Sequence, residues 1–255
     1  MTLQIVTIPC LSDNYAYLAH DPATGATAAV DVPEAAPIIA ELKAQGWTLS
    51  DVLLTHHHAD HVQGLPDLLA VAPARVVGAA VDAHRLPPLD IALNEDDTVR
   101  IGDEEGRVID VSGHTVGHVA FHFPDSGAVF TADSLMALGC GRVFEGTMEQ
   151  MHASLAKLTT LPPETVVYSG HEYTLNNAKF ALTVDPDNPR LKSRIKEIDA
   201  KRAIGKPTVP STLAEELATN PFLRASDPDI QSRLGMTGEA PGTVFAEIRA
   251  RKDRF

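Results

Sequence analysis

The chain has 255 residues, 44% of them hydrophobic, which is enough to bury one substantial core, or a core with a small appended domain. Its formal net charge of −13 argues against a nucleic-acid partner, because binding to phosphates needs a basic face. The sequence has no apolar run of the roughly 18 residues needed to span a bilayer and no signal peptide, so we expect a cytoplasmic protein without a membrane partner.

The N-terminal part is predicted to be a β meander that is followed by a helix and a buried strand. The strands are short, are bounded by turn residues, and are predicted at residues 3–8, 15–19, 26–32 and 51–55. Residues 34–45 have helical composition, and Gly46 provides the stop. Cys10 and Cys140 are too few for a disulfide scaffold, so we interpret them as small buried residues or as the lining of a site.

The middle of the chain is predicted to be mainly β, and the end mainly helical. The middle strands are predicted at residues 75–77, 98–101, 107–111, 118–123, 128–131 and 166–168, with one helix at 149–158. The later helices are predicted at residues 175–182, 191–203, 213–217 and 244–252. This change predicts two domains, 1–173 and 174–255.

A histidine-rich sequence directly follows the apolar strand at residues 51–55. Five potential metal ligands occur within six positions, and they are His56, His57, His58, Asp60 and His61. The cluster is predicted to lie on a loop from a strand to a helix, where a rigid scaffold commonly holds reactive groups. One loop of this kind can present ligands in two directions.

Three later ligands each follow an apolar strand. They are His114, Asp133 and His171. With the histidine-rich loop, they supply enough nitrogen and oxygen donors for two adjacent divalent cations. Such donors suit zinc, with iron or manganese as alternatives, and they indicate metal-assisted hydrolysis.

This set of residues resembles the metallo-β-lactamase superfamily, which implies an α+β fold, a four-layered αββα sandwich with metals at one edge of its sheets. The resemblance implies that His56, His58 and His114 hold the first metal. It implies that Asp60, His61 and His171 hold the second, and that Asp133 bridges the two. His57 is expected to support the loop, and His118 and His122 are expected to be structural.

Over essentially its whole length the chain is similar to the glyoxalase II family, the hydroxyacylglutathione hydrolases. The motifs that carry this similarity are Asp13-Asn-Tyr15, Gly139-Cys-Gly-Arg142, Phe144-Glu-Gly-Thr147, Gly170-His-Glu-Tyr-Thr-Leu-Asn-Asn177, residues 210–224 and the basic C-terminal segment. The resemblance implies that Arg142, Tyr173, Arg249 and Lys252 bind glutathione and that the region 174–255 is a helical substrate-binding domain. Residues three apart share a helix face, so Arg249 and Lys252 can converge on one anion.

Two positions depart from the pattern of some members of this family. Those members carry lysine at the position of Arg142 and tyrosine at the position of Phe144. An arginine can still clamp a carboxylate. Phe144 has no hydroxyl group to donate, so the contacts with glutathione are expected to differ there.

The expected reaction is hydrolysis of an S-(2-hydroxyacyl)glutathione, such as S-D-lactoylglutathione, to glutathione and a 2-hydroxy acid. A hydroxide that bridges the two metals is expected to attack the thioester carbonyl, with Asp60 and Asp133 as the catalytic carboxylates. The thiol leaves as a thiolate with little acid assistance, because its unperturbed pKa is about 8.5. We expect the protein to act as a monomer on this small-molecule partner.

Three other functions fit parts of the sequence. A persulfide dioxygenase would use one iron and molecular oxygen, but it does not account for the long helical C-terminal part. A flavodiiron-type protein would carry a glutamate where this chain has His58. A non-catalytic zinc-binding module is disfavoured because many structural zinc sites use cysteine thiolates.

Overall fold

The computed structural model describes residues 2–255, and these form two compact units. The first unit comprises the chain up to Val111 together with Val116–Thr131. The second comprises Ser112–Thr115 together with Ala132–Phe255. The predicted division into 1–173 and 174–255 differs from these units and stays a prediction.

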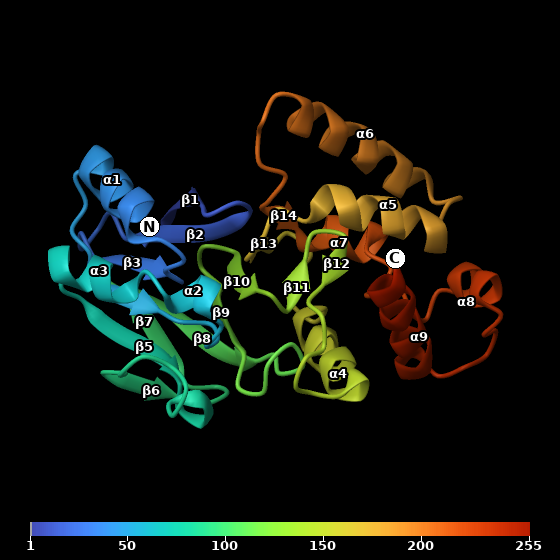
Figure 1. The fold of residues 1–255 in the computed structure, drawn as a ribbon, viewed down its shortest axis with the longest axis horizontal. Helices are drawn as coiled ribbons and strands as arrows, with labels where there is room; N and C mark the ends of the chain where they lie inside the picture. The colour runs from blue at the N-terminus through green and yellow to red at the C-terminus, as the bar shows by residue number, and fades with distance from the viewer. Residues whose placement is uncertain (1) are drawn as a thin grey trace. The chain divides into compact units, whose positions relative to one another are not determined.

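The first unit contains a mixed sheet of six strands in sequence order (Figure 1). Its strands are β1 (Gln4–Cys10), β2 (Asn14–His20), β3 (Thr27–Val30), β4 (Asp51–Leu53), β5 (Arg75–Ala79) and β6 (Ile91–Leu93). The first three strands pair antiparallel, and β3 to β6 pair in parallel. The carboxyl ends of β3 and β4 therefore lie at the same edge, so the residues that follow these strands can meet.

Two helices, α1 (Ala35–Gln45) and α3 (Leu65–Val71), pack on this sheet. Ile38 and Leu42 of α1 and Leu68 of α3 share one apolar cluster with strand residues such as Leu18 and Val52. Helix α1 ends as predicted at Gly46, whose φ of 71° is readily adopted by glycine. Alternate strand residues thus face these helices, and their neighbours face the opposite side of the sheet.

A second group of strands covers that opposite side. It comprises β7 (Thr98–Ile101), β8 (Glu104–Asp110), β9 (Val119–Phe123) and β10 (Ala128–Ala132), which pair antiparallel with their neighbours in sequence. The ring of Tyr17 on β2 lies 5.6 Å from that of Phe130 on β10, and Phe130 in turn contacts Phe123. The first unit is therefore built of a helical layer and two β layers around a buried interior.

The second unit is mainly helical. Its helices are α4 (Met148–Leu158), α5 (Thr174–Val184), α6 (Pro189–Ala203), α7 (Leu213–Thr219), α8 (Pro228–Leu234) and α9 (Pro241–Arg254). Its strands form two antiparallel pairs, β11 (Leu135–Met136) with β12 (Gly139–Cys140) and β13 (Val166–Ser169) with β14 (Ser211–Thr212). The buried rings of Phe180, Phe222 and Phe245 join α5, the segment after α7, and α9. Helix α9 is thereby fixed against the rest of this unit.

Most of the longer elements occur where they were predicted, although the ends shift by a few residues. The elements that were not predicted are all short, and they are α2 (Ala59–Val62), α3, the single-turn helix η1 (Ala80–Asp82), β6, β11, β12, β14 and α8. Cys10 and Cys140 are free and buried, as predicted, and burial raises the pKa of each thiol to about 11. Among residues 2–255, no helix is long and apolar enough to cross a membrane.

Candidate active site

The histidine-rich loop leaves the end of β4 and runs into α2. His56 and His61 are fully buried, His58 is half-buried, and their rings contact one another, with His56 4.8 Å from His58 and 4.2 Å from His61 between ring centroids. Asp60 lies in the first turn of α2, and its Oδ2 is 3.9 Å from Nε2 of His61. The loop therefore gathers four of the predicted ligands within the first unit.

Asp31, directly after β3, fixes this loop through hydrogen bonds. Its Oδ1 accepts a hydrogen bond from the backbone N–H of Thr55 at 2.9 Å, and its Oδ2 accepts from Oγ1 of Thr55 and from Nδ1 of His61, both at 2.8 Å. Since Oγ1 of Thr55 donates its proton to Asp31, Nδ1–H of His56 donates to that oxygen at 3.0 Å. Both rings are thereby set with the proton on Nδ1, which leaves Nε2 as a lone-pair donor for a metal.

His57 contacts the edge of the His58 ring, with centroids 5.0 Å apart, and is held by a carboxylate outside the loop. Its Nδ1 is 2.9 Å from Oδ2 of the buried Asp82, which also accepts from Nε of Arg85. Nη2 of Arg85 donates to the carbonyl of Val116 at 2.6 Å. The structure thus gives His57 the supporting contact that was expected for it.

Asn14 and His118 complete the surroundings of the loop. Nδ2 of Asn14 donates to both the carbonyl and the carboxylate of Asp60 at 3.0 Å, which fixes the orientation of that side chain. The buried ring of His118 stacks on His56 with centroids 4.6 Å apart and ring planes at 14°. His118 was expected to be structural, and this stacking packs it directly against the ring of a predicted ligand.

The second unit holds three further predicted ligands, and two of them are histidines that face the carboxylate of the third. Oδ2 of Asp133 lies 3.5 Å from Nε2 of His114 and 3.3 Å from Nε2 of His171, and all three side chains are buried. Nδ1 of His114 donates to the carbonyl of Arg142 at 2.8 Å, so its Nε2 also carries a lone pair. Two imidazole nitrogens that face a single carboxylate oxygen form a donor set that suits a divalent cation.

The four predicted substrate residues also lie in the second unit. Arg249, on α9, is 4% exposed, donates from Nη1 to the carbonyl of Cys140 at 2.9 Å, and lies over the ring of Phe222 at 5.1 Å. Lys252 is half-buried, and its Nζ donates to the carbonyl of Asn176 at 3.4 Å. Burial first, and the charge of Arg249 second, lower the pKa of Lys252 to about 8.

Arg142 reaches the same helix from the segment after β12. Its Nε lies 3.3 Å from Oδ1 of Asp253, and its guanidinium lies 5.8 Å from the centre of the Phe144 ring. A Cβ atom at Gly141 would come within 2.0 Å of the carbonyl oxygen of Asp133. Only glycine fits there, so the segment with Arg142 packs directly against a predicted metal ligand.

Two exposed aromatic rings accompany the histidines of this unit. Tyr173 stacks on His171 with centroids 4.6 Å apart and planes at 10°. Phe144 is 60% exposed and lies 5.3 Å from the ring of His114. Each of these two histidines therefore has an aromatic neighbour that is itself exposed to solvent.

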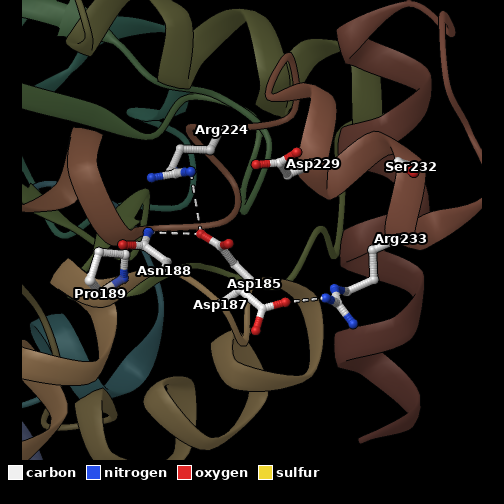
Figure 2. A pocket seen from close by; sticks show the side chains of 8 residues that line it. All are labelled: Asp185, Asp187, Asn188, Pro189, Arg224, Asp229, Ser232 and Arg233. Atoms are coloured by element: carbon white, nitrogen blue, oxygen red, sulfur yellow. Dashed lines mark hydrogen bonds and ion pairs between the residues drawn. The ribbon is translucent and has the colours of Figure 1, made fainter.

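A cavity of about 710 Å³ occurs elsewhere in the second unit (Figure 2). It is lined by Asp185, Asp187, Asn188, Pro189, Arg224, Asp229, Ser232 and Arg233. Both arginines are paired within its wall, Arg224 with Asp185 at 3.3 Å and Arg233 with Asp187 at 2.5 Å. None of the predicted site residues is among the eight that line it, so it is not the predicted site.

The fold of the chain is similar to that of a known superfamily. The metallo-β-lactamase superfamily model matches residues 21–171, so the chain belongs to this superfamily. The structure of the BLEG-1 B3 metallo-β-lactamase is similar in fold, with a TM-score of 0.67 and 21% identity over 86% of this chain and 99% of that one. The predicted fold class, an α+β αββα sandwich with a C-terminal helical region, is confirmed.

Within that superfamily the chain belongs to the hydroxyacylglutathione hydrolase family. The model described as the hydroxyacylglutathione hydrolase C-terminus matches residues 172–255. A relative from Jannaschia sp. (strain CCS1), named hydroxyacylglutathione hydrolase, is 69% identical over 99% of this chain and 98% of its own length. The family that the sequence motifs predicted is therefore confirmed.

The superfamily and the clustered donors together indicate a site for two metal ions. The structure of TTHA1623 in a di-iron-bound form is similar to this chain, with a TM-score of 0.61 and 27% identity over 86% of this chain and all of that one. The role of each predicted ligand remains a prediction.

The sequence did not single out three residues that the structure brings to this machinery. Asp31 and Asp82 contact the histidine-rich loop, and Asp253 contacts two of the predicted substrate residues. Asp31 had a detectable signal, since it follows an apolar strand as Asp133 does. Nothing in the local sequence of Asp82 or Asp253 marks either residue.

Proposed function

We propose that this protein hydrolyses the thioester of an S-(2-hydroxyacyl)glutathione, releasing glutathione and a 2-hydroxy acid, and that it does so as a cytoplasmic monomer. The observation that carries the proposal is the occurrence, in one chain, of a metal-donor set and a separate group of buried and half-buried cations, Arg249 and Lys252 with Arg142. Metal-assisted hydrolysis needs the first group, and an anionic glutathione moiety needs the second.

The metal ligands are assigned on donor chemistry and on family membership. His56, His58 and His114 would hold one ion, Asp60, His61 and His171 would hold the other, and Asp133 would bridge them. Nε2 lone pairs on His56, His61 and His114 support this assignment, because hydrogen bonds at Nδ1 fix the tautomer of each ring. Nitrogen and carboxylate donors suit zinc, and iron or manganese fit the same donors.

Two divalent cations bound by these residues would supply a water of lowered pKa and would polarise the thioester carbonyl. The side chains have their own parts in the reaction. Asn14 holds the carboxylate of Asp60 in one orientation, so that Asp60 can accept a hydrogen bond from the attacking water. The leaving thiol needs little proton transfer, since a pKa of about 8.5 allows it to depart as a thiolate.

The substrate would be held by charge and by aromatic contact. Arg142, Arg249 and Lys252 would bind its carboxylate groups, and Tyr173, which stacks on His171, would donate a hydroxyl hydrogen bond close to the reacting carbonyl. The helical region also favours this proposal over a persulfide dioxygenase, because the model described as the hydroxyacylglutathione hydrolase C-terminus matches residues 172–255.

The test is hydrolysis of S-D-lactoylglutathione by the purified protein, followed by the loss of thioester absorbance. Activity should disappear with a chelator and return with zinc, and metal analysis of the protein as purified would identify the native ions. A protein that holds two metals but does not cleave the thioester would contradict the proposal, and oxygen consumption with a persulfide substrate would favour the dioxygenase instead.

A further inference from the structure

One carboxylate oxygen joins the cations that come from distant parts of the second unit. Oδ1 of Asp253 accepts a hydrogen bond from Nη2 of Arg249 at 2.9 Å and lies 3.3 Å from Nε of Arg142. Arg249 is one turn earlier on α9, whereas Arg142 follows the β11–β12 hairpin. Asp253 is thus the connection between the helix and the segment that carries Arg142.

We propose that Asp253 is a positioning residue for substrate binding, which holds the guanidinium groups of Arg142 and Arg249 so that both face one bound carboxylate. The inference rests on the proposed function for its substrate. It assigns Asp253 no contact with the substrate and no part in bond cleavage.

The buried position of Arg249 makes this contact necessary. A guanidinium that is 4% exposed needs a carboxylate or several acceptors, because an uncompensated buried charge is strongly destabilising. Arg249 has the carbonyl of Cys140 on one side and Asp253 on the other. Among residues 2–255, Asp253 is the only carboxylate that forms a hydrogen bond with Arg249, and removing it would leave the guanidinium without this partner.

The charge balance leaves the cluster attractive to anions. Arg142, Arg249 and Lys252 carry three positive charges and Asp253 one negative charge, which leaves an excess of two. A glutathione moiety has carboxylates that can use this excess. Asp253 therefore fixes the cations without neutralising them.

Asp253 also acts on the neighbouring Lys252. Burial and the charge of Arg249 lower the pKa of Lys252, whereas the charge of Asp253 raises it, as Cys140 would in its thiolate form, and the net value is about 8. The other groups that face the Lys252 ammonium are uncharged, the carbonyl of Asn176 and the rings of Phe180 and Phe255. Removing the Asp253 charge should therefore lower the pKa of Lys252 further, so that Lys252 loses its proton at a lower pH.

The test compares Asp253→Asn with the wild-type protein across about pH 6 to 9, using S-D-lactoylglutathione as substrate and glutathione as a product inhibitor. At neutral pH we expect KM and the inhibition constant of glutathione to rise about tenfold, with kcat within about twofold, because the contact serves binding and not bond cleavage. In wild type, KM should rise above pH 8, as Lys252 loses its charge. In the variant this rise should begin at lower pH.

Three further variants make the result specific. Glu247→Gln removes the carboxylate of another i,i+4 pair on α9, with Arg251 at 2.7 Å, and it should leave KM and kcat unchanged. Asp253→Glu keeps the charge and should recover most of the affinity. Because Arg142 is largely exposed, Arg142→Gln should fold normally, and its effect on KM should be much smaller in the Asp253→Asn background.

An unchanged KM and inhibition constant in a folded Asp253→Asn protein would overturn the proposal, and so would strictly additive effects of the two substitutions. If Asp253→Asn does not fold, Asp253→Glu and Arg142→Gln are each compared with wild type instead. Equal KM values for all three proteins would overturn the proposal. Failure of the proposed function is distinguishable, because it would appear as absent turnover in wild type. Calorimetric binding of glutathione would then test Asp253 without any reaction.

Discussion

The histidine-rich loop and the cation cluster are held in place by different means. Around the loop, the contacts are short hydrogen bonds between fully buried groups, such as those from Asp31 to Thr55 and His61. Around the cations, Arg142 and Asp253 are 55% and 30% exposed and meet through ion pairs. Buried networks hold one geometry, whereas partly exposed ion pairs are weaker and are screened by salt.

This difference matches the function proposed for each region. Metal ligands must keep nearly fixed positions, because affinity depends on the distances and on the tautomer of each ring. Long cationic side chains that bind a flexible peptide-like ligand can tolerate small adjustments. We therefore expect substitutions of the predicted metal ligands and of the residues that hold them to have larger effects than substitutions among the cations.

The largest effect is expected for Asp133→Ala. This change removes the carboxylate that His114 and His171 share, so the protein should lose metal, and kcat/KM should fall roughly a thousandfold, about 4 kcal/mol. Metal analysis and thioester hydrolysis measure the two consequences independently.

Asp187→Ala is the matched control for this change. Asp187 is also an aspartate of the second unit, but its exposed side chain pairs with Arg233 in the wall of the cavity in Figure 2. Metal content and activity should remain at the level of wild type. Full metal occupancy in a folded Asp133→Ala protein would show that Asp133 is not a ligand.

A smaller effect is expected for Asp31→Asn, which tests the hydrogen bonds beneath the loop. If the amide oxygen continues to accept from the Thr55 N–H, the amide N–H group faces Nδ1 of His61 and forces that nitrogen to become an acceptor. The proton then moves to Nε2, which can no longer bind metal. Zinc affinity, measured by competition with a chelator, should fall about 10-fold to 100-fold.

The control for Asp31→Asn is Asp51→Asn, a change of another buried aspartate on the same sheet. Asp51 pairs with the exposed Arg75 at 2.7 Å and lies at the start of β4, whereas the histidine-rich loop follows the end of that strand. It should lower stability at most and leave zinc affinity unchanged. Equal zinc affinities in Asp31→Asn and wild type would mean that the tautomer of His61 is set by another group.

The same contrast explains how far the sequence alone could predict this molecule. The predicted metal donors lie directly after apolar strands or within six consecutive positions, so local patterns were enough to propose them. Residues such as Asp253 and Asp82 act through partners far away in sequence, and a single chain gives no sign of those contacts. The family motifs indicated Arg142 and Arg249, but not the carboxylate that joins them.

The fold shows a similar limit. Long elements with a clear apolar pattern, such as α1 and β2, were predicted to within one or two residues at each end. The two-residue strands β11 and β12 were not predicted, because two residues cannot display a period. Their hairpin is held instead by buried side chains, including Asn220, whose Nδ2 donates to the carbonyls of Met136 at 3.1 Å and Gly139 at 2.9 Å.

The smallest effect is expected for Phe144→Tyr, which alters the exposed side of the cation cluster without removing a charge. The ring should keep its contacts with His114 and Arg142, and at 60% exposure the added hydroxyl group has room. One additional neutral hydrogen bond to glutathione should lower KM about threefold and leave kcat unchanged. Tyr173→Phe makes the opposite change beside His171 and should raise KM by a similar factor. An unchanged or higher KM in Phe144→Tyr, with a normal response in Tyr173→Phe, would show that the ring at position 144 does not face the glutathione moiety.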